Sequence, residues 1–213
     1  MAVLTLKKTL WYSQPGVSKR HDTMRVIAGA QKGRRLEGPK GHRLRPTAER
    51  VKEALFSILG PRLIGARFLD LYAGTGSIGI EALSRGAQGV TFVEQNPACL
   101  SLLRTNLARC RLTEMADVHA CSAARFLARH KWEDNPYDIV FADPPYRADE
   151  EIDVLPLLGQ PERCAHGLTV VVEHPRKLDA RPQVGRLTRL RQYRYGDTTL
   201  SVYGSDAAGT RIP

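Results

Sequence analysis

The residue pattern most specific for chemistry in this 213-residue chain is Asp143-Pro144-Pro145-Tyr146. The two prolines fix their φ angles and cannot donate hydrogen bonds, so we expect a stiff turn. Asp143 and the Pro144 carbonyl can accept two hydrogens from one planar amine, and Tyr146 offers an aromatic face to a flipped base. Such acceptors stabilise the positive charge that develops on an aryl amine during attack. The pattern predicts methylation of an exocyclic amine without a metal, with Asp143, Pro144 and Tyr146 as catalytic residues.

A glycine-rich segment, Asp70-Leu71-Tyr72-Ala73-Gly74-Thr75-Gly76, indicates which cofactor serves this chemistry. Gly74 and Gly76 permit a tight turn and a close approach of a ligand to the backbone. With Gly79 they also match the dinucleotide fingerprint, which alone is a weak signal. The Asp70 carboxylate would repel a pyrophosphate but attract the ammonium and sulfonium groups of S-adenosylmethionine. We therefore expect S-adenosylmethionine rather than NAD, bound by Asp70, Gly74 and Gly76.

Glu94 closes the next predicted strand, 20 residues after Gly74. An acidic side chain at this place can accept hydrogen bonds from both ribose hydroxyls of an adenosine. Glu94 is therefore predicted to bind the cofactor's ribose, although this role does not distinguish one adenosine cofactor from another.

The elements that must position these residues alternate between strands and helices. The strands are expected over residues 68–72, 90–94, around Val118, 137–141 and 167–173, and the helices over 78–84, 98–110 and 123–130. This alternation predicts a parallel α/β sheet covered on both faces. Ligands of such sheets bind at the carboxyl ends of the strands. A hairpin is expected over residues 187–203, turned by Gly196-Asp197.

The region before the first core strand combines a helix with a basic segment. A helix is predicted from an N-cap at Thr47 to Gly60-Pro61, with an apolar face of Val51, Ala54, Leu55, Ile58 and Leu59 and a polar face of Arg50, Lys52 and Ser57. Met24 begins an alternating run that is typical of a strand, and the glycines after it predict a hairpin or loops.

The net charge of +10 is concentrated in two segments. Residues 19–50 hold ten Lys and Arg against three acidic residues, and residues 176–194 hold seven against Asp179 alone. Such segregation favours a polyanionic partner, because neutralised phosphates release counterions, although solvated basic faces are the ordinary alternative. RNA-binding is expected from the first segment, through Arg34, Arg35, Arg43, Arg45 and Arg50.

The spacing of the cysteines and the hydropathy of the chain indicate the cellular compartment in which we expect the protein. Four widely spaced cysteines without a CxxC pair are typical of reduced thiols rather than of a zinc site or a disulfide scaffold. No apolar run is long enough for a secretory signal or a membrane span. We expect a cytoplasmic protein.

Taken together, the motifs resemble a known family. The glycine segment, Glu94 and the Asp143 turn are similar to class I methyltransferases that modify exocyclic amines. Four further segments resemble the bacterial 16S ribosomal RNA guanine-N2 methyltransferase family. These segments are Met24-Arg25-Val26-Ile27-Ala28-Gly29, Leu44-Arg45-Pro46-Thr47, Arg50-Val51-Lys52-Glu53-Ala54-Leu55-Phe56 and Glu81-Ala82-Leu83-Ser84-Arg85-Gly86-Ala87. The similarity extends from Met24 to about Tyr203.

The resemblance implies a Rossmann-like, mostly parallel sheet of seven strands, with helices on both faces and an antiparallel last strand. It implies transfer of a methyl group from S-adenosylmethionine to one guanine of 16S rRNA, in the small ribosomal subunit or its assembly intermediate. Ser122 stands where the family often has Asp or Asn to meet the adenine amine. We expect a poorly ordered extension over 1–23, a basic RNA-binding hairpin over 24–45, the methyltransferase domain over 46–204 and a tail over 205–213.

Two other functions are compatible with parts of this pattern. DNA adenine-N6 and protein glutamine-N5 methyltransferases use the same type of turn, and the basic segment and Arg45-Pro46-Thr47 argue against them. An RNA-binding module with an inactive core is the third hypothesis, and the intact Asp143, Glu94 and glycines argue against it.

Overall fold

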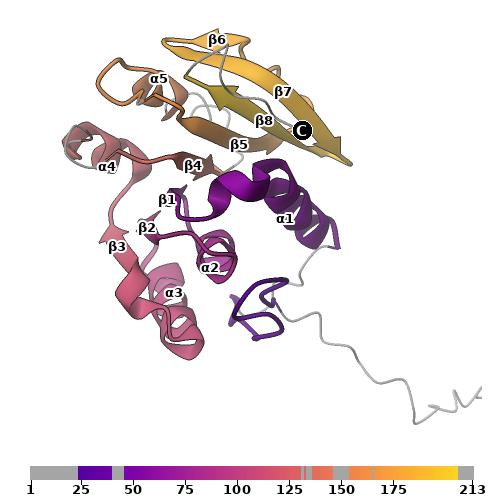
Figure 1. Cartoon of the computed structure of the whole chain (residues 1–213), viewed down its shortest axis with the longest axis vertical. Coiled ribbons are helices and arrows are strands. Elements are labelled where there is room, and N and C mark those ends of the chain that lie inside the picture. Colours follow the sequence, from indigo (N-terminus) through magenta and orange to yellow (C-terminus); the bar gives the residue numbers. More distant parts are fainter. Residues whose placement is uncertain are drawn as a thin grey trace, which may run out of the picture.

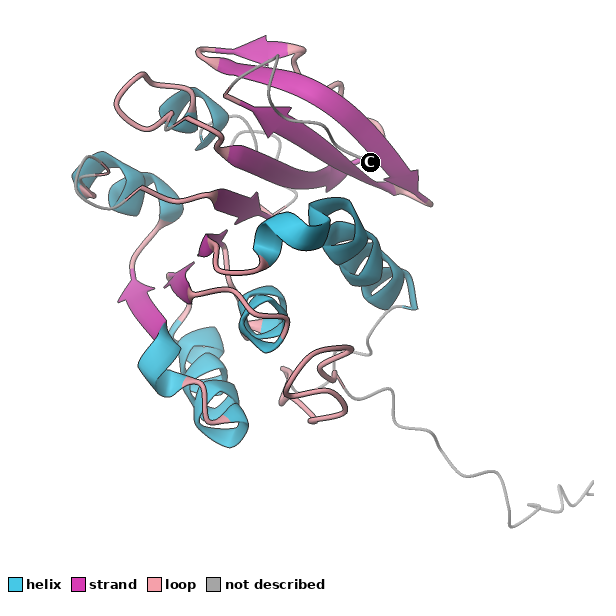
Figure 2. Cartoon of the chain, viewed as in Figure 1, coloured by secondary structure: helices cyan, strands magenta, loops and turns pink. Residues whose placement is uncertain are grey.

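The computed structural model describes residues 24–39, 46–130, 132, 136–145, 154–164 and 166–205, and of residues 46–48 only the backbone. The predicted alternation of strands and helices is confirmed (Figure 2). The elements are α1 (Pro46–Leu59), η1 (Gly60–Leu63), β1 (Arg67–Leu71), α2 (Ser77–Ser84), β2 (Gly89–Glu94), α3 (Pro97–Cys110), η2 (Thr113–Met115), β3 (Ala116–Ala120), α4 (Ala123–Arg129), β4 (Ile139–Ala142), α5 (Val154–Leu158), β5 (Thr169–Pro175), β6 (Gln183–Val184), β7 (Leu187–Tyr195) and β8 (Thr198–Gly204).

The strands of the described residues form one sheet in the order β3-β2-β1-β4-β5-β8-β7-β6 (Figure 1). The first five of these are parallel, and β8 runs antiparallel to β5. The expected antiparallel last strand and the hairpin of β7 and β8 are therefore confirmed. The expected number of seven strands is wrong by one, because the two residues of β6 pair with the start of β7. So short a strand has no periodicity for a sequence pattern to reveal.

Helices cover both faces of the sheet, as a mostly parallel sheet requires (Figure 1). One apolar cluster joins α1, α2 and α3 to one face, through residues such as Leu55, Ile80 and Leu103. A second cluster joins α4 and α5 to the other face, through Phe126 and Leu158. Within the described part of the chain, no helix is long and apolar enough to cross a membrane.

The strand predicted to start at Met24 is reduced to an isolated antiparallel bridge between Arg25 and Arg35. Around it, Val26 N–H donates to the Arg34 carbonyl at 2.9 Å and Leu36 N–H to the Met24 carbonyl at 2.7 Å. The predicted strand is thus wrong in extent. We refer to residues 24–39, whose backbone is held mainly by side chains of α2 and α3, as the N-terminal arm.

The predicted start of the first helix is also shifted. The helix α1 begins at Pro46, so Thr47 lies inside it rather than at its N-cap. Proline is favoured in the first helical turn because its missing N–H would have no partner there. The predicted end is confirmed, since α1 stops at Leu59 and Gly60 and Pro61 continue as the 3₁₀ helix η1.

Candidate active site

Sheet topology explains why two motifs that lie 70 residues apart in the sequence meet in space. The strands β1 and β4 are direct neighbours, with Leu71 paired to Ala142. The chain proceeds from β1 toward β2 and from β4 toward β5, so the strand order reverses between β1 and β4. The glycine turn leaves the carboxyl end of β1, and Asp143 leaves that of β4. Both therefore lie at the switch point, where ligands of such sheets bind.

Gly74 and Gly76 occupy their positions for different structural reasons. Both adopt the left-handed region, Gly74 at φ 55° and Gly76 at φ 83°. A Cβ on Gly76 would lie 2.3 Å from a methyl group of Leu103, so this glycine lets α2 approach α3. A Cβ on Gly74 would meet nothing within 4 Å. Gly74 is thus the one whose open surroundings a ligand could use.

Asp70 lies beneath this turn rather than in the wall of a cleft. It is 1% exposed, and its Oδ2 accepts a hydrogen bond of 2.9 Å from Gly79 N–H in the first turn of α2. Burial raises the pKa of Asp70 to about 8; the hydrogen bond from Gly79 opposes that shift, while the charges of Asp143 and Glu94 add to it. Three carboxyl groups therefore share one region, and a bound cation would favour their ionised forms.

Glu94 organises the glycine turn with its carboxylate. Its Oε2 accepts from Gly74 N–H at 2.8 Å and its Oε1 from Asn96 N–H at 2.7 Å. Each oxygen keeps a further lone pair, so the carboxylate can still accept from a ligand. Asn96 in turn caps α3, accepting from the N–H groups of Ala98 and Cys99. The predicted ribose acceptor is thereby held at a fixed position.

A cleft of about 430 Å³ brings together several residues predicted from the sequence. Glu94, Ser122 and Asp143 line it, and Tyr72 and Cys121 complete part of its wall. Ser122 is the N-cap of α4, since its Oγ accepts from Arg125 N–H at 3.3 Å. Its hydroxyl hydrogen can still be donated to a ligand. Two carboxyl groups and a hydroxyl group thus belong to the residues that line one cleft.

Asp143 also borders a second cavity, of about 190 Å³, on the side of α1 and α2. We refer to this space as the β5 cavity, because Glu173 near the end of β5 lines it together with Met24, Lys52 and Phe141. Asp143 is exposed and Pro144 is buried. Tyr146 lies outside the described residues. Asp143 is thus the residue that the cleft and the β5 cavity have in common.

The predicted RNA-binding arginines are only partly described. Arg34, Arg35 and Arg50 are exposed on the N-terminal arm and α1, whereas Arg43 and Arg45 lie outside the described residues. Arg34 Nη1 donates to the Arg109 carbonyl at 3.0 Å, so this side chain also helps to hold the arm on α3.

Sequence reasoning missed the buried ion pair that holds the N-terminal arm next to the site. Glu81 of α2 is fully buried and accepts from Ile27 N–H at 2.7 Å and Ala28 N–H at 2.9 Å. Lys52 of α1 is 5% exposed, lies 3.4 Å from Glu81, and donates to the Arg25 carbonyl at 2.9 Å. Lys52, which the sequence assigns to the polar face of this helix, is thus buried, because an acidic partner on another helix makes its burial tolerable.

Tyr72 is a second residue that the sequence did not single out. It follows β1 directly, lines the cleft, and has a φ of 64°, which is uncommon for a residue other than glycine. Strain of this kind concentrates at functional sites. Its position between the strand end and Gly74 was the available signal.

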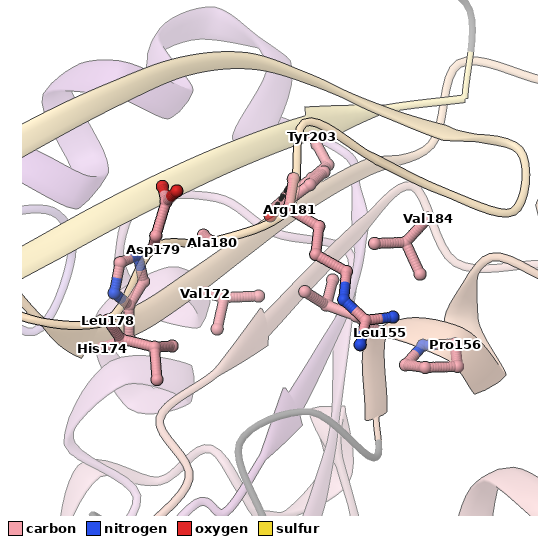
Figure 3. Close-up of a pocket in the computed structure, with 10 residues that line it drawn as sticks. All are labelled: Leu155, Pro156, Val172, His174, Leu178, Asp179, Ala180, Arg181, Val184 and Tyr203. Atoms are coloured by element: carbon pink, nitrogen blue, oxygen red, sulfur yellow. Dashed lines mark hydrogen bonds between the residues drawn. The ribbon is translucent and has the colours of Figure 1, made fainter. Parts of the chain in front are cut away.

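A further cavity, of about 110 Å³, lies apart from these residues, between α5 and the end of β5. Figure 3 shows Arg181 extending toward Leu155 and Pro156, with His174 and Tyr203 elsewhere in the wall. None of the residues predicted to act in catalysis or binding lines it. His174 is engaged internally, with its Nε2 2.7 Å from Ser201 Oγ. We assign the chemistry to the switch point instead.

Comparison with known proteins identifies the family to which the chain belongs. The family model described as "Conserved hypothetical protein 95" matches residues 24–204. The chain belongs to this family. The resemblance inferred from the motifs is thereby confirmed, and the match starts at Met24, where the similarity was expected to begin.

Relatives of the chain carry the names of methyltransferases. The chain is 36% identical over 180 residues to "Putative rRNA methyltransferase YlbH" of Bacillus subtilis, which covers 84% of this chain and 98% of that protein. It is 41% identical over 135 residues to "Ribosomal RNA small subunit methyltransferase D" of Escherichia coli, covering 62% of this chain and 66% of that protein. The solved structure of "Putative methyltransferase yhhF" from Escherichia coli matches with a TM-score of 0.75 and 34% identity, over 86% of this chain and 99% of that one.

Proposed function

We propose that this protein transfers a methyl group from S-adenosylmethionine to the exocyclic N2 amine of a guanine in 16S ribosomal RNA. The observation that carries the proposal is the position of Asp143, which borders both the cleft with Glu94 and the β5 cavity. A methyl donor in the first and a base in the second would meet at this carboxylate. The reaction would take place in the cytoplasm, on the small ribosomal subunit or its assembly intermediate.

The cleft suits a cationic adenosine cofactor by its chemistry. Glu94 would hold the ribose, Gly74 would allow close approach, and Ser122 would meet the adenine. When bound, S-adenosylmethionine supplies an activated methyl group on a positively charged sulfur. The clustered carboxyl groups of Asp70, Glu94 and Asp143 favour that charge, whereas they would repel the pyrophosphate of NAD.

The chain's own groups would then position the amine and stabilise its developing charge. Asp143 and the Pro144 carbonyl would accept the two N–H bonds of the target amine, which stabilises the nitrogen as it becomes positive. Tyr146 would stack on the base. Holding the amine at the switch point replaces a chance encounter by a fixed geometry, and this positioning supplies much of the acceleration.

The exposed basic side chains and the names of the relatives both support RNA as the substrate. Arg34, Arg35 and Arg50 are exposed on the N-terminal arm and α1, and the same two elements supply Arg25 and Val51 to the wall of the β5 cavity. Arg176 and Lys177, from the second basic segment, are exposed directly after β5, at the carboxyl edge of the sheet. The relatives' names refer to ribosomal RNA, which favours this substrate over DNA adenine or protein glutamine.

The test is methyl transfer from labelled S-adenosylmethionine to small ribosomal subunits that lack the modification, followed by digestion to nucleosides. We expect the label in N2-methylguanosine of the 16S rRNA. Label in adenine, in protein or in no product would refute the proposed function.

Removing exposed arginines beside the site should weaken RNA binding in a salt-dependent way. Arg35→Ala combined with Arg50→Ala is expected to flatten the slope of log K against log salt by roughly two units, because each phosphate contact contributes a little under one. Binding to 16S rRNA fragments at several salt concentrations measures the slope. Arg129→Ala on α4, on the other face of the sheet, is the matched control and should leave it unchanged. An unaltered slope in the double variant would place the RNA elsewhere.

Cofactor affinity should increase with pH up to about 8. The raised pKa of Asp70 means that this carboxyl is protonated in the empty site below about pH 8, and a cationic ligand favours its ionised form. Binding then releases a proton, so affinity should fall by up to about tenfold per unit as the pH is lowered. Calorimetry with S-adenosylmethionine measures this dependence, and Asp70→Asn should flatten it. A variant with the same pH dependence as the natural protein would show that Asp70 does not sense the cofactor's charge.

A further inference from the structure

The β5 cavity contains a hydrogen-bond acceptor, Glu173, that has no role in the proposed reaction as described above. Glu173 and Asp143 both line this cavity, and the apolar part of its wall comes from Val51, Leu55 and Phe141. A volume of about 190 Å³ is on the scale of one planar base rather than a whole nucleotide. A third carboxyl residue, Glu49, also lines the cavity and lies 3.9 Å from Arg25. Carboxyl groups on an apolar slot are suited to a flat ligand whose edge carries hydrogen-bond donors.

The groups around Glu173 leave its carboxyl available for such a ligand. Within the described part of the chain, its side chain makes no hydrogen bond or ion pair to a protein group. Burial and the charge of Asp143 raise the pKa of Glu173 to about 8. The two cations that line the same cavity have other partners, since Lys52 donates to the Arg25 carbonyl and Arg25 lies 3.9 Å from Glu49, which also lines the cavity.

Guanine presents donors in the arrangement that this pair requires. Its N1–H and its N2 amine are adjacent donors on one edge, whereas adenine presents an unprotonated N1 beside its amine. If Asp143 accepts from the N2 amine, the neighbouring N1–H needs a second acceptor in the same cavity. Two other carboxyl groups line it: Glu49, which lies 3.9 Å from Arg25, and Glu173, which has no ion pair with a described residue. Glu173 is therefore the acceptor that we assign to N1–H.

We infer that Glu173 accepts the N1–H of the target guanine and so makes the β5 cavity selective for guanine over bases with an unprotonated N1. This inference rests on the proposed function and adds a specificity-determining residue to it. An unprotonated N1 would face the Glu173 carboxylate without a hydrogen between them, and leaving such groups unpaired in a partly buried site costs affinity.

The test compares two targets in reconstituted small subunits, one with guanine and one with 2,6-diaminopurine at the modified position. Both bases carry the N2 amine, but only guanine has N1–H. At a pH above the raised pKa of Glu173, the natural protein should prefer guanine by about ten- to a hundredfold in kcat/KM. Glu173→Gln should reduce this preference at least tenfold, because its amide N–H can donate to an unprotonated N1. Glu53→Gln, on the exposed side of α1, is the matched control.

The outcomes separate this inference from the proposed function. No transfer to guanine by the natural protein would refute both. Transfer to guanine with no preference over diaminopurine would refute only the role of Glu173, and that measurement needs no variant to fold. An equal loss on both bases in Glu173→Gln, with an unchanged preference ratio, would likewise overturn it.

Discussion

Replacing Asp143 by alanine is expected to slow methyl transfer about a hundred- to a thousandfold while leaving the affinity for S-adenosylmethionine within a few-fold. The expected loss is that of removing one preorganised group from the place where transition-state charge develops. The cofactor should still bind, because Glu94, Ser122 and the glycine turn would be unchanged. Single-turnover kinetics on small subunits measure the first quantity, and calorimetry measures the second.

Asp143→Asn is the control for this prediction. An asparagine keeps one acceptor oxygen and nearly the same shape, so it should retain more activity than alanine. Equal losses of transfer and cofactor binding in Asp143→Ala would mean that Asp143 holds the turn together instead of accepting from the amine.

Replacing Glu81 by alanine is expected to lower the free energy of unfolding by about 3–5 kcal/mol. Its carboxylate is fully buried, pairs with Lys52 at 3.4 Å and Arg85 at 2.8 Å, and accepts from two N–H groups of the N-terminal arm. Removing one partner of a buried pair leaves an uncompensated charge, which costs this amount. Burial already lowers the pKa of Lys52, and without Glu81 the main opposing influence is lost. Urea denaturation monitored by circular dichroism gives the value.

Two variants show whether this loss arises from the pair. Glu114→Ala removes an exposed glutamate and should change stability by less than about 0.5 kcal/mol. Lys52→Met in the Glu81→Ala background removes the orphaned charge and should restore part of the stability. A loss below about 1 kcal/mol in Glu81→Ala would show that the pair does not hold the arm.

The sequence was sufficient for the parts of the fold and site that depend on local pattern. The alternation of strands and helices predicts a parallel sheet, and the carboxyl ends of its strands carry the motifs. For this reason Glu94 and Asp143 could be assigned to one site from the sequence pattern, and Ser122 was added by the family resemblance; all three line one cleft.

Features that depend on pairing between distant segments could not be predicted. Lys52 and Glu81 lie on different helices, and no pattern in either helix reveals that the other will be its partner. Asp70 was expected to face the cofactor, but its side chain points under the glycine turn and holds Gly79 N–H, so its direct contact with a ligand stays a prediction. Glu173 lies near the end of an apolar strand and gains significance only because β5 lies beside β4.

The proposed reaction depends most directly on where the methyl group of the bound cofactor points. A crystal structure of this protein with S-adenosylmethionine is the measurement that tests it. We predict the ribose at Glu94 and the methyl group directed past Asp143 toward the β5 cavity. A cofactor bound elsewhere, or a methyl group turned away from Asp143, would contradict the proposed reaction.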